Sequence, residues 1–464
     1  MNKYQRLATN TFLMSIGTFG SKLLVFLMVR FYTGYLTPAE YGTADLITQT
    51  ANLLIPLVSL DITDGVFRFA ADRQNGRTSV FTVGFRIITL GSAGMLLVIF
   101  LLRRIPAVHA YGMLLASFVM ASCYHGLCAH FVRARGNTAL FAAQGLLNTA
   151  LFLAWNVLFL AIFHWGVRGY VLSTTVANLV TTGFLVWKER LWRFVGRQAA
   201  SSLQRQMLQY CIPLIPAAVF WWIMGVSDRY MVQYFLGSDA NGIYAVAYKI
   251  PTILTILASV FLDAWQLSAI VESGGSRNAH LRFYGRIWDA FTSVVLLGAG
   301  GIIAASPLLI RILADPSYYD AWRYVPMLTL SMAAAAFSNF MGSVYVVTKK
   351  STASFWTSLA GAAANIVLNL WLIPRIGIQG AAVATFASCL VVFLIRLVSA
   401  RRILPFPLSG VKLTLGVGAL LLQTAFLLFH WPGWLLIQCA GIAWLLLLGV
   451  PAVLSTVKVI FHRK

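Results

Sequence analysis

Charged side chains stand inside the long apolar runs of this chain, and their types indicate what chemistry the protein could do. An ionisable group in an apolar medium costs at least about 2.5–3.5 kcal/mol, so it should pair with a neighbour or face a wet cavity. Seven bases and six acids lie in such runs: Lys22, Arg30, Arg86, Arg229, Lys249, Arg286 and Arg396, with Asp45, Asp61, Asp64, Asp228, Asp263 and Asp289.

Three of the bases lack an acid that a helix would place beside them. Neither Lys22 nor Lys249 has an acid three or four residues away, and Arg229 has only Asp228 next to it. Adjacent residues point about 100° apart on a helix, so Asp228 does not face Arg229 across it. Ammonium and guanidinium groups can replace the lost hydration of a diphosphate. We therefore predict that Lys22, Arg229 and Lys249 bind an anionic substrate, with snorkelling or structural pairing as the competing interpretation.

Two of the acids, Asp45 and Asp263, suit a different role. They could balance the cations or bind H⁺ or Na⁺, because a carboxylate beside a lysine titrates with it as a pair. Structural pairing is again the competing interpretation. No metal site is predicted. Cys123, His125 and His130 are possible metal ligands in one predicted helix, but His125 points about 160° away from the face that Cys123 and His130 share.

The elements that position these residues must lie in a membrane. Of the 464 residues 59% are hydrophobic and only 10% are charged, against roughly 25% charged in a typical soluble domain. The net charge is +22, but the basic residues lie in short gaps between apolar runs. That pattern excludes a nucleic-acid binder, which needs a solvated basic face. All five cysteines lie in apolar segments, which argues against a disulfide framework.

A membrane span needs about 20 mostly apolar residues. By this criterion the chain is predicted to be an all-α integral membrane protein with fourteen transmembrane helices. They lie at residues 9–31, 42–67, 79–102, 108–130, 140–163, 167–187, 207–235, 241–268, 284–310, 323–346, 353–373, 377–400, 411–429 and 434–457. With the N-terminus in the cytoplasm, 22 Lys and Arg fall on the cytoplasmic side and six on the other. This bias predicts that both termini are cytoplasmic.

The chain also repeats itself. Matching positions are Trp165–Gly169 with Ile376–Gly380, Thr174 with Thr385, Tyr41 with Tyr244, and Val58–Asp61 with Val260–Asp263. Each half holds six spans and starts on the cytoplasmic side, so the repeats are parallel. We therefore predict two six-helix lobes around a central cavity, which is a transporter architecture. The N-lobe is expected at residues 1–200, the C-lobe at 201–405, and two further helices at 406–464.

Three segments resemble those of bacterial polysaccharide flippases. The family's seventh-to-eighth helix signature is similar to SDRYMVQYFLGSDANGIYAVAYKIP (Ser227–Pro251). Its eleventh-to-twelfth and first-to-second helix turns are similar to IPRIGIQGAAVATF (Ile373–Phe386) and LTPAEYGTADLI (Leu36–Ile47). The chain therefore resembles the Wzx-like flippases of the multidrug/oligosaccharidyl-lipid/polysaccharide (MOP) superfamily. The resemblance implies a V-shaped, two-lobed fold that alternates between inward-open and outward-open states, with a lipid-tail groove formed by residues 406–464.

The resemblance also implies a function. It predicts a flippase that moves undecaprenyl-diphosphate-linked oligosaccharide repeat units from the cytoplasmic to the outer leaflet of the bacterial cytoplasmic membrane by alternating access. Membrane lipids and polysaccharide-assembly proteins are the further expected partners. No cofactor is expected beyond H⁺ or Na⁺ as a coupling ion.

Two other functions compete with this one. A cation-coupled multidrug exporter of the same superfamily is the alternative, and the embedded charges do not separate it from a flippase. The resemblance at Ser227–Pro251 favours the flippase. A membrane glycan polymerase or acyltransferase is a distant alternative, because such an enzyme needs a sizeable extracytoplasmic loop or a cluster of catalytic His and Asp. The chain is therefore predicted not to be an enzyme.

Overall fold

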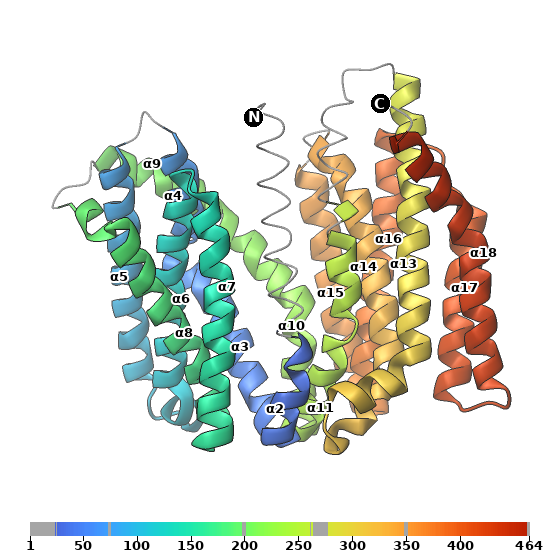
Figure 1. The fold of residues 1–464 in the computed structure, drawn as a ribbon, viewed down its shortest axis with the longest axis horizontal. Coiled ribbons are helices and arrows are strands. Elements are labelled where there is room, and N and C mark those ends of the chain that lie inside the picture. The colour runs from blue at the N-terminus through green and yellow to red at the C-terminus, as the bar shows by residue number, and fades with distance from the viewer. Residues whose placement is uncertain are drawn as a thin grey trace. The chain divides into compact units, whose positions relative to one another are not determined.

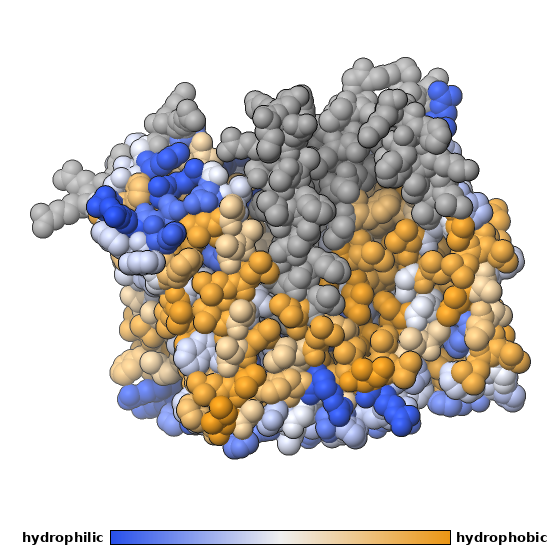
Figure 2. Space-filling model, in the orientation of Figure 1, coloured by the Kyte–Doolittle hydropathy of each residue, from blue (hydrophilic) through white to orange (hydrophobic). Residues whose placement is uncertain are grey.

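Long apolar helices make up most of the computed structural model. The structure describes residues 24, 26–72, 76–196, 201–259, 261–262, 277–347 and 351–461. The chain divides into two compact units, Met1–Val226 and Ser227–Lys464, which are coloured blue to green and green to red in Figure 1. Hydrophobic side chains cover the middle of the helices in each unit, and hydrophilic ones gather near helix ends (Figure 2). This distribution matches an apolar layer bounded by water.

The helices of the first unit pack around α6. They are α2 (Val29–Tyr35), α3 (Pro38–Ser59), α4 (Ile62–Ala71), α5 (Arg77–Leu101), α6 (Pro106–Ala134), α7 (Thr138–Asn156), α8 (Gly166–Glu189) and α9 (Ser201–Cys211). A π-helical turn, Val157–Ile162, continues α7, and a short 3₁₀ helix, η2 (Leu191–Phe194), follows α8. Helix α6 contacts α3, α4, α5, α7 and α8. It is therefore the central helix of this unit.

One predicted span is broken in the structure. The sequence predicts a continuous helix over 42–67, but α3 ends at Ser59 and α4 begins at Ile62. Leu60 and Asp61 between them adopt left-handed backbone conformations, with φ of 50° and 52°. Pro56 lies within the last turn of α3, where it has no N–H for the helix. The apolar pattern continues through the break because both pieces pack on the same core.

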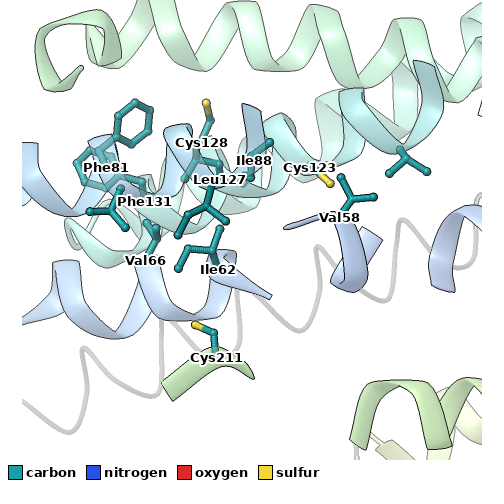
Figure 3. Packing of buried hydrophobic residues seen from close by; sticks show 14 of the residues in the cluster. Val58, Ile62, Val66, Phe81, Ile88, Cys123, Leu127, Cys128, Phe131 and Cys211 are labelled. Atoms are coloured by element: carbon teal, nitrogen blue, oxygen red, sulfur yellow. The ribbon is translucent and has the colours of Figure 1, made fainter. Parts of the chain in front are cut away.

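That core joins α3, α4, α5, α6 and α9. Side chains such as Ile62, Leu127, Phe131 and Cys211 are buried completely and lie together (Figure 3). Helices α3 and α5 approach so closely that a Cβ on Gly91 would overlap the Val58 carbonyl oxygen. Glycine at this position therefore permits the helices to pack.

Gly91→Ala is expected to destabilise the protein by about 1–3 kcal/mol, because the new methyl group forces α3 and α5 apart. Gly94→Ala is the matched control on the same helix, since a Cβ at Gly94 meets no atom within 4 Å. Helix propensity alone favours alanine by up to about 1 kcal/mol, so the control should be neutral or stabilising. Thermal unfolding of the two purified variants checks this. Equal melting temperatures would contradict the close packing.

The second unit contains the end of α10 (Ile215–Leu236) and the helices that follow it. These are α11 (Ser238–Lys249), α13 (Arg277–Leu313), the 3₁₀ helix η4 (Pro316–Arg323), α14 (Val325–Val347), α15 (Ser351–Ile376), α16 (Ile378–Ile403), α17 (Gly410–Leu428) and α18 (Trp434–Phe461). Helix α16 packs on α14 and α15, and α13 packs on α14, α17 and α18.

The last two helices are joined by a pair of glutamines. The side-chain Nε2 of Gln423 donates to the backbone carbonyl oxygen of Gln438 at 3.2 Å. In return, the side-chain Nε2 of Gln438 donates to the backbone carbonyl oxygen of Gln423 at 2.8 Å. Both side chains are buried. On α17, Lys412 Nζ donates to Ser293 Oγ of α13 at 2.6 Å. The hairpin of α17 and α18 is therefore fixed to the second unit by polar as well as apolar contacts.

The predicted all-α membrane fold is confirmed. In the part of the chain that the structure describes, eleven helices are long and apolar enough to cross a membrane. A twelfth is added if the pair Ser201–Phe220 and Trp222–Leu236, bent by 42°, is one span. These helices match the twelve spans predicted from 79–102 onward. Of the two remaining predictions, 9–31 lies mostly outside the described residues, and 42–67 is the broken pair α3 and α4.

Candidate functional site

A buried polar cluster lies in the second unit, where α10, α11, α15 and α16 meet. These helices come close because α16 begins with small residues: a Cβ on Gly380 would lie 2.5 Å from the Leu372 carbonyl oxygen of α15. Ala381, Ala382 and Ala384 after it are fully buried. The small side chains leave room for polar groups of four helices to reach one another.

Asp228 is the centre of this cluster. Its Oδ2 accepts hydrogen bonds from the Tyr244 hydroxyl at 2.6 Å and from Thr385 Oγ1 at 3.1 Å, while its Oδ1 accepts from the Arg229 backbone N–H at 2.9 Å. The carboxylate is 1% exposed. Burial of a carboxylate is costly without such donors, so these three bonds make its position tolerable. The donors come from α10, α11 and α16, and Asp228 therefore ties three helices together.

Amide groups of α15 extend the cluster. Ser227 Oγ and Asn369 Nδ2 donate to Asn365 Oδ1 at 3.1 and 3.0 Å, and Asn365 Nδ2 donates to Ser388 Oγ at 3.2 Å. The Oδ1 of Asn369 is buried and accepts no hydrogen bond from the described residues. The cluster therefore offers carboxylate, amide and hydroxyl oxygens, which are the groups that a proton or a hard cation binds.

Arg229, predicted to bind an anion, lies beside this cluster. Its guanidinium carbon is 4.7 Å from the centre of the Tyr248 ring of α11, and the side chain is 4% exposed. Lys249 follows Tyr248 at the end of α11 and is half-buried. The structure therefore places Arg229 against the ring of Tyr248, which is the residue before Lys249 in α11, and both predicted cations belong to the second unit.

Of the other predicted site residues, the structure describes only Asp45. Lys22 and Asp263 lie outside the described residues. Asp45 is on α3 of the first unit, where it is 8% exposed and its Oδ1 accepts a long hydrogen bond from Gln49 Nε2 at 3.4 Å. Arg229 and Lys249 thus belong to the second unit, and Asp45 belongs to the first.

Sequence reasoning missed Asp228 as a functional candidate and treated it only as a neighbour of Arg229. A signal was present: Tyr244 and Thr385, which donate to Asp228, are both positions that match across the internal repeat. Tyr41 is the matching position of Tyr244 in the first unit. Its ring packs against Tyr170 of α8 at 6.2 Å.

The first unit has a second polar cluster, between α6, α7 and α8. His125 Nε2 is 2.8 Å from Gln144 Oε1, and Asn148 Nδ2 donates to Asn178 Oδ1 at 2.8 Å. Asn178 Nδ2 in turn donates to Ser122 Oγ at 3.0 Å. Neutral groups thus satisfy one another across three helices, which is how membrane helices commonly use amides.

Comparisons with known proteins bear on the family and the fold of the chain. The model of the family described as polysaccharide biosynthesis protein matches residues 7–265, more than half of the chain. Two uncharacterized membrane proteins of Methanocaldococcus jannaschii, MJ1375 and MJ1068, are each 24% identical to it, over 295 and 219 residues. The matches cover 56% and 46% of this chain and 66% and 43% of theirs. The chain thus spans less than two thirds of either relative.

Solved structures of transporters share the fold. The lipid II flippase MurJ in an inward closed conformation has a TM-score of 0.68 at 14% identity, covering 97% of this chain and 99% of its own. An inward-facing multidrug transporter of the MATE family, in the MOP superfamily, has a TM-score of 0.62 at 13% identity, covering 82% and 95%. A mutant of the Vibrio cholerae MATE transporter VcmN has a TM-score of 0.58 at 16% identity, covering 86% and 97%. These neighbours are membrane transporters rather than enzymes.

Proposed function

Because this chain belongs to the polysaccharide biosynthesis protein family and has the fold of MOP-superfamily transporters, we propose that it is a lipid-linked oligosaccharide flippase. Its substrate is an undecaprenyl-diphosphate-linked repeat unit, which it moves from the cytoplasmic to the outer leaflet. The family match over residues 7–265 carries this proposal, since it connects a transporter fold with polysaccharide biosynthesis.

The reaction needs no covalent chemistry. The protein shelters the diphosphate and sugars while the prenyl tail stays in lipid, and it alternates between inward-open and outward-open states. Arg229, Lys249 and Lys22 are the proposed diphosphate ligands, because cations replace the hydration that the anion loses. The membrane potential favours export of an anion by about 2.3 kcal/mol per charge per 100 mV.

We further propose that transport is coupled to H⁺ or Na⁺ through Asp228. This carboxylate is supported by its position beside Arg229 and among the amide and hydroxyl oxygens of Asn365, Asn369 and Thr385. Binding of a cation there would change the charge next to Arg229, and so its attraction for an anion. Asp45 and Asp263 remain candidates for charge balance.

Reconstitution tests the proposed transport directly. Vesicles containing the purified protein and a fluorescent lipid-linked oligosaccharide are treated with a membrane-impermeant quencher, which reports the leaflet of the sugar. Protein-dependent movement of the label between leaflets supports a flippase. If the vesicles instead extrude a cationic dye and leave the labelled lipid in place, the multidrug exporter is the correct function.

The orientation of the chain in the bacterial cytoplasmic membrane is a separate prediction. The basic bias places Ser201 in the cytoplasm and Asp239 outside, and both side chains are exposed. A cysteine introduced at Asp239 should therefore react with an impermeant thiol reagent in intact cells, and one at Ser201 should react only after lysis. The parent protein without either new cysteine is the control, and the opposite pattern would reverse the topology.

A further inference from the structure

A small basic cavity lies at the end of α8 in the first unit, away from the residues considered so far. It has a volume of about 470 Å³ and is lined by Trp187, Lys188, Arg190, Trp192 and Arg193. We name it the α8–η2 pocket. Arg190 adopts a left-handed conformation, with φ of 52°, that turns the chain from α8 into η2. This turn brings the three cations and two tryptophans around one space.

The pocket is held in place by contacts behind it. Leu191 is 1% exposed and belongs to the core of the first unit. The Phe194 ring packs on Phe131 at 5.2 Å and on the Arg135 guanidinium at 5.0 Å. Thr82 Oγ1 of α5 donates to the Phe194 carbonyl oxygen at 3.1 Å. The segment is therefore positioned before any ligand arrives, which lowers the entropy cost of binding.

The positive charge of the pocket is not neutralised by the neighbouring acid. Glu189 Oε2 accepts from Arg135 Nη1 at 2.7 Å, and its Oε1 accepts from Asn137 Nδ2 at 2.9 Å, so both carboxylate oxygens are engaged. Within the described part of the chain, no ion pair joins Lys188, Arg190 or Arg193 to an acid. The cavity thus presents three cations and needs an anion.

The position of the pocket identifies the source of that anion. The apolar helix Gly166–Glu189 ends at the pocket, so the cavity lies where a membrane span meets water. Trp187 and Trp192 are 69% and 52% exposed, and tryptophan favours the headgroup level of a bilayer. The basic bias predicts that this end faces the cytoplasm, where anionic headgroups attract clustered Lys and Arg. We propose that the α8–η2 pocket binds the phosphodiester headgroup of an anionic phospholipid in the cytoplasmic leaflet.

In this site the arginines and Lys188 bind the phosphate, and the tryptophans contact the upper acyl chains. The lipid is a resident of the first unit and not the transported substrate. The competing explanation is that these bases serve only as a topology signal, in which case they would show no preference over other bases on the same side.

A pair of matched variants separates the two explanations. Arg190→Gln/Arg193→Gln removes two cations from the pocket, and Arg401→Gln/Arg402→Gln removes two exposed arginines from the end of α16. The dissociation constant for fluorescent phosphatidylglycerol is measured on the purified full chain at one ionic strength. The pocket variant should bind about 30-fold more weakly, and the control should change by less than about 3-fold. An equal loss in both variants would overturn the proposal.

Two further measurements identify the ligand, and a third variant is available if the double variant does not fold. Fluorescent phosphatidylcholine should bind at least about tenfold more weakly than phosphatidylglycerol, and equal binding would overturn the anionic preference. Inorganic phosphate should not displace the lipid, and displacement at similar concentration would indicate a site for the free ion. Should the double variant fail to fold, Lys188→Gln on the exposed face of α8 should still weaken phosphatidylglycerol binding by about fivefold. Unchanged binding of that variant would also overturn the proposal.

Discussion

Replacing Asp228 with alanine is expected to reduce surface polysaccharide by at least about tenfold. The change removes the acceptor of the Tyr244 and Thr385 hydroxyls, and each buried polar group left without a partner costs about 1–3 kcal/mol. Stability and export should therefore both fall. The amount of protein in the membrane, measured beside the surface polysaccharide, shows how much of the loss is due to misfolding.

Asp228→Asn removes the negative charge and keeps the shape of the side chain. Asparagine keeps one acceptor oxygen and nearly the same volume, so the membrane level should stay close to that of the wild type while export is lost. In reconstituted vesicles the wild-type protein should respond to a Na⁺ or H⁺ gradient, and Asp228→Asn should not. Asp239→Asn, at an exposed position of α11, is the matched control. Normal export by Asp228→Asn would show that the carboxylate has only a structural role.

The second large effect is expected at Arg229 and Lys249, the two predicted cations of the second unit. Arg229→Ala and Lys249→Ala should each abolish surface polysaccharide and cause lipid-linked repeat units to accumulate, because the diphosphate loses a cationic partner. Lys249→Arg should retain part of the activity, since charge survives while geometry changes. Quantifying the lipid-linked intermediate together with the protein level checks this.

Because Arg229 is buried, its loss can affect folding as well as transport, so control variants are needed. Arg229 is 4% exposed, so Arg229→Lys is needed to show that a smaller cation at the same place keeps the fold. Arg286→Ala, at an exposed position of α13, should export normally. If both Arg229→Ala and Lys249→Ala export normally, structural pairing is the better account of these residues.

The spans could be predicted from the sequence because length and hydropathy alone decide them. The α3–α4 break could not, since the left-handed Leu60 and Asp61 leave the apolar pattern intact. Just before the break, the Val58 carbonyl oxygen packs closely on Gly91 of α5. Such a contact joins residues far apart in the chain, and no local pattern reports it.

The candidate site could be predicted only in part, because it too depends on contacts between residues far apart in the chain. Helical spacing searched for partners of the embedded charges only three or four residues away. The partners of Asp228 are 16 and 157 residues away, at Tyr244 and Thr385. The internal repeat did mark those two positions, yet it could not tell that their hydroxyls would donate to the carboxylate of Asp228.

The reciprocal glutamine bonds between α17 and α18 bear on how the protein is synthesised. A lone glutamine amide is costly in lipid. The Nε2 groups of Gln423 and Gln438 each donate to the other residue's backbone carbonyl oxygen. The Nε2 groups of these amides are therefore satisfied only when both helices are present. The two helices should leave the translocon together as one hairpin, and a nascent chain that stops before Gln438 should be recognised by membrane quality-control proteases.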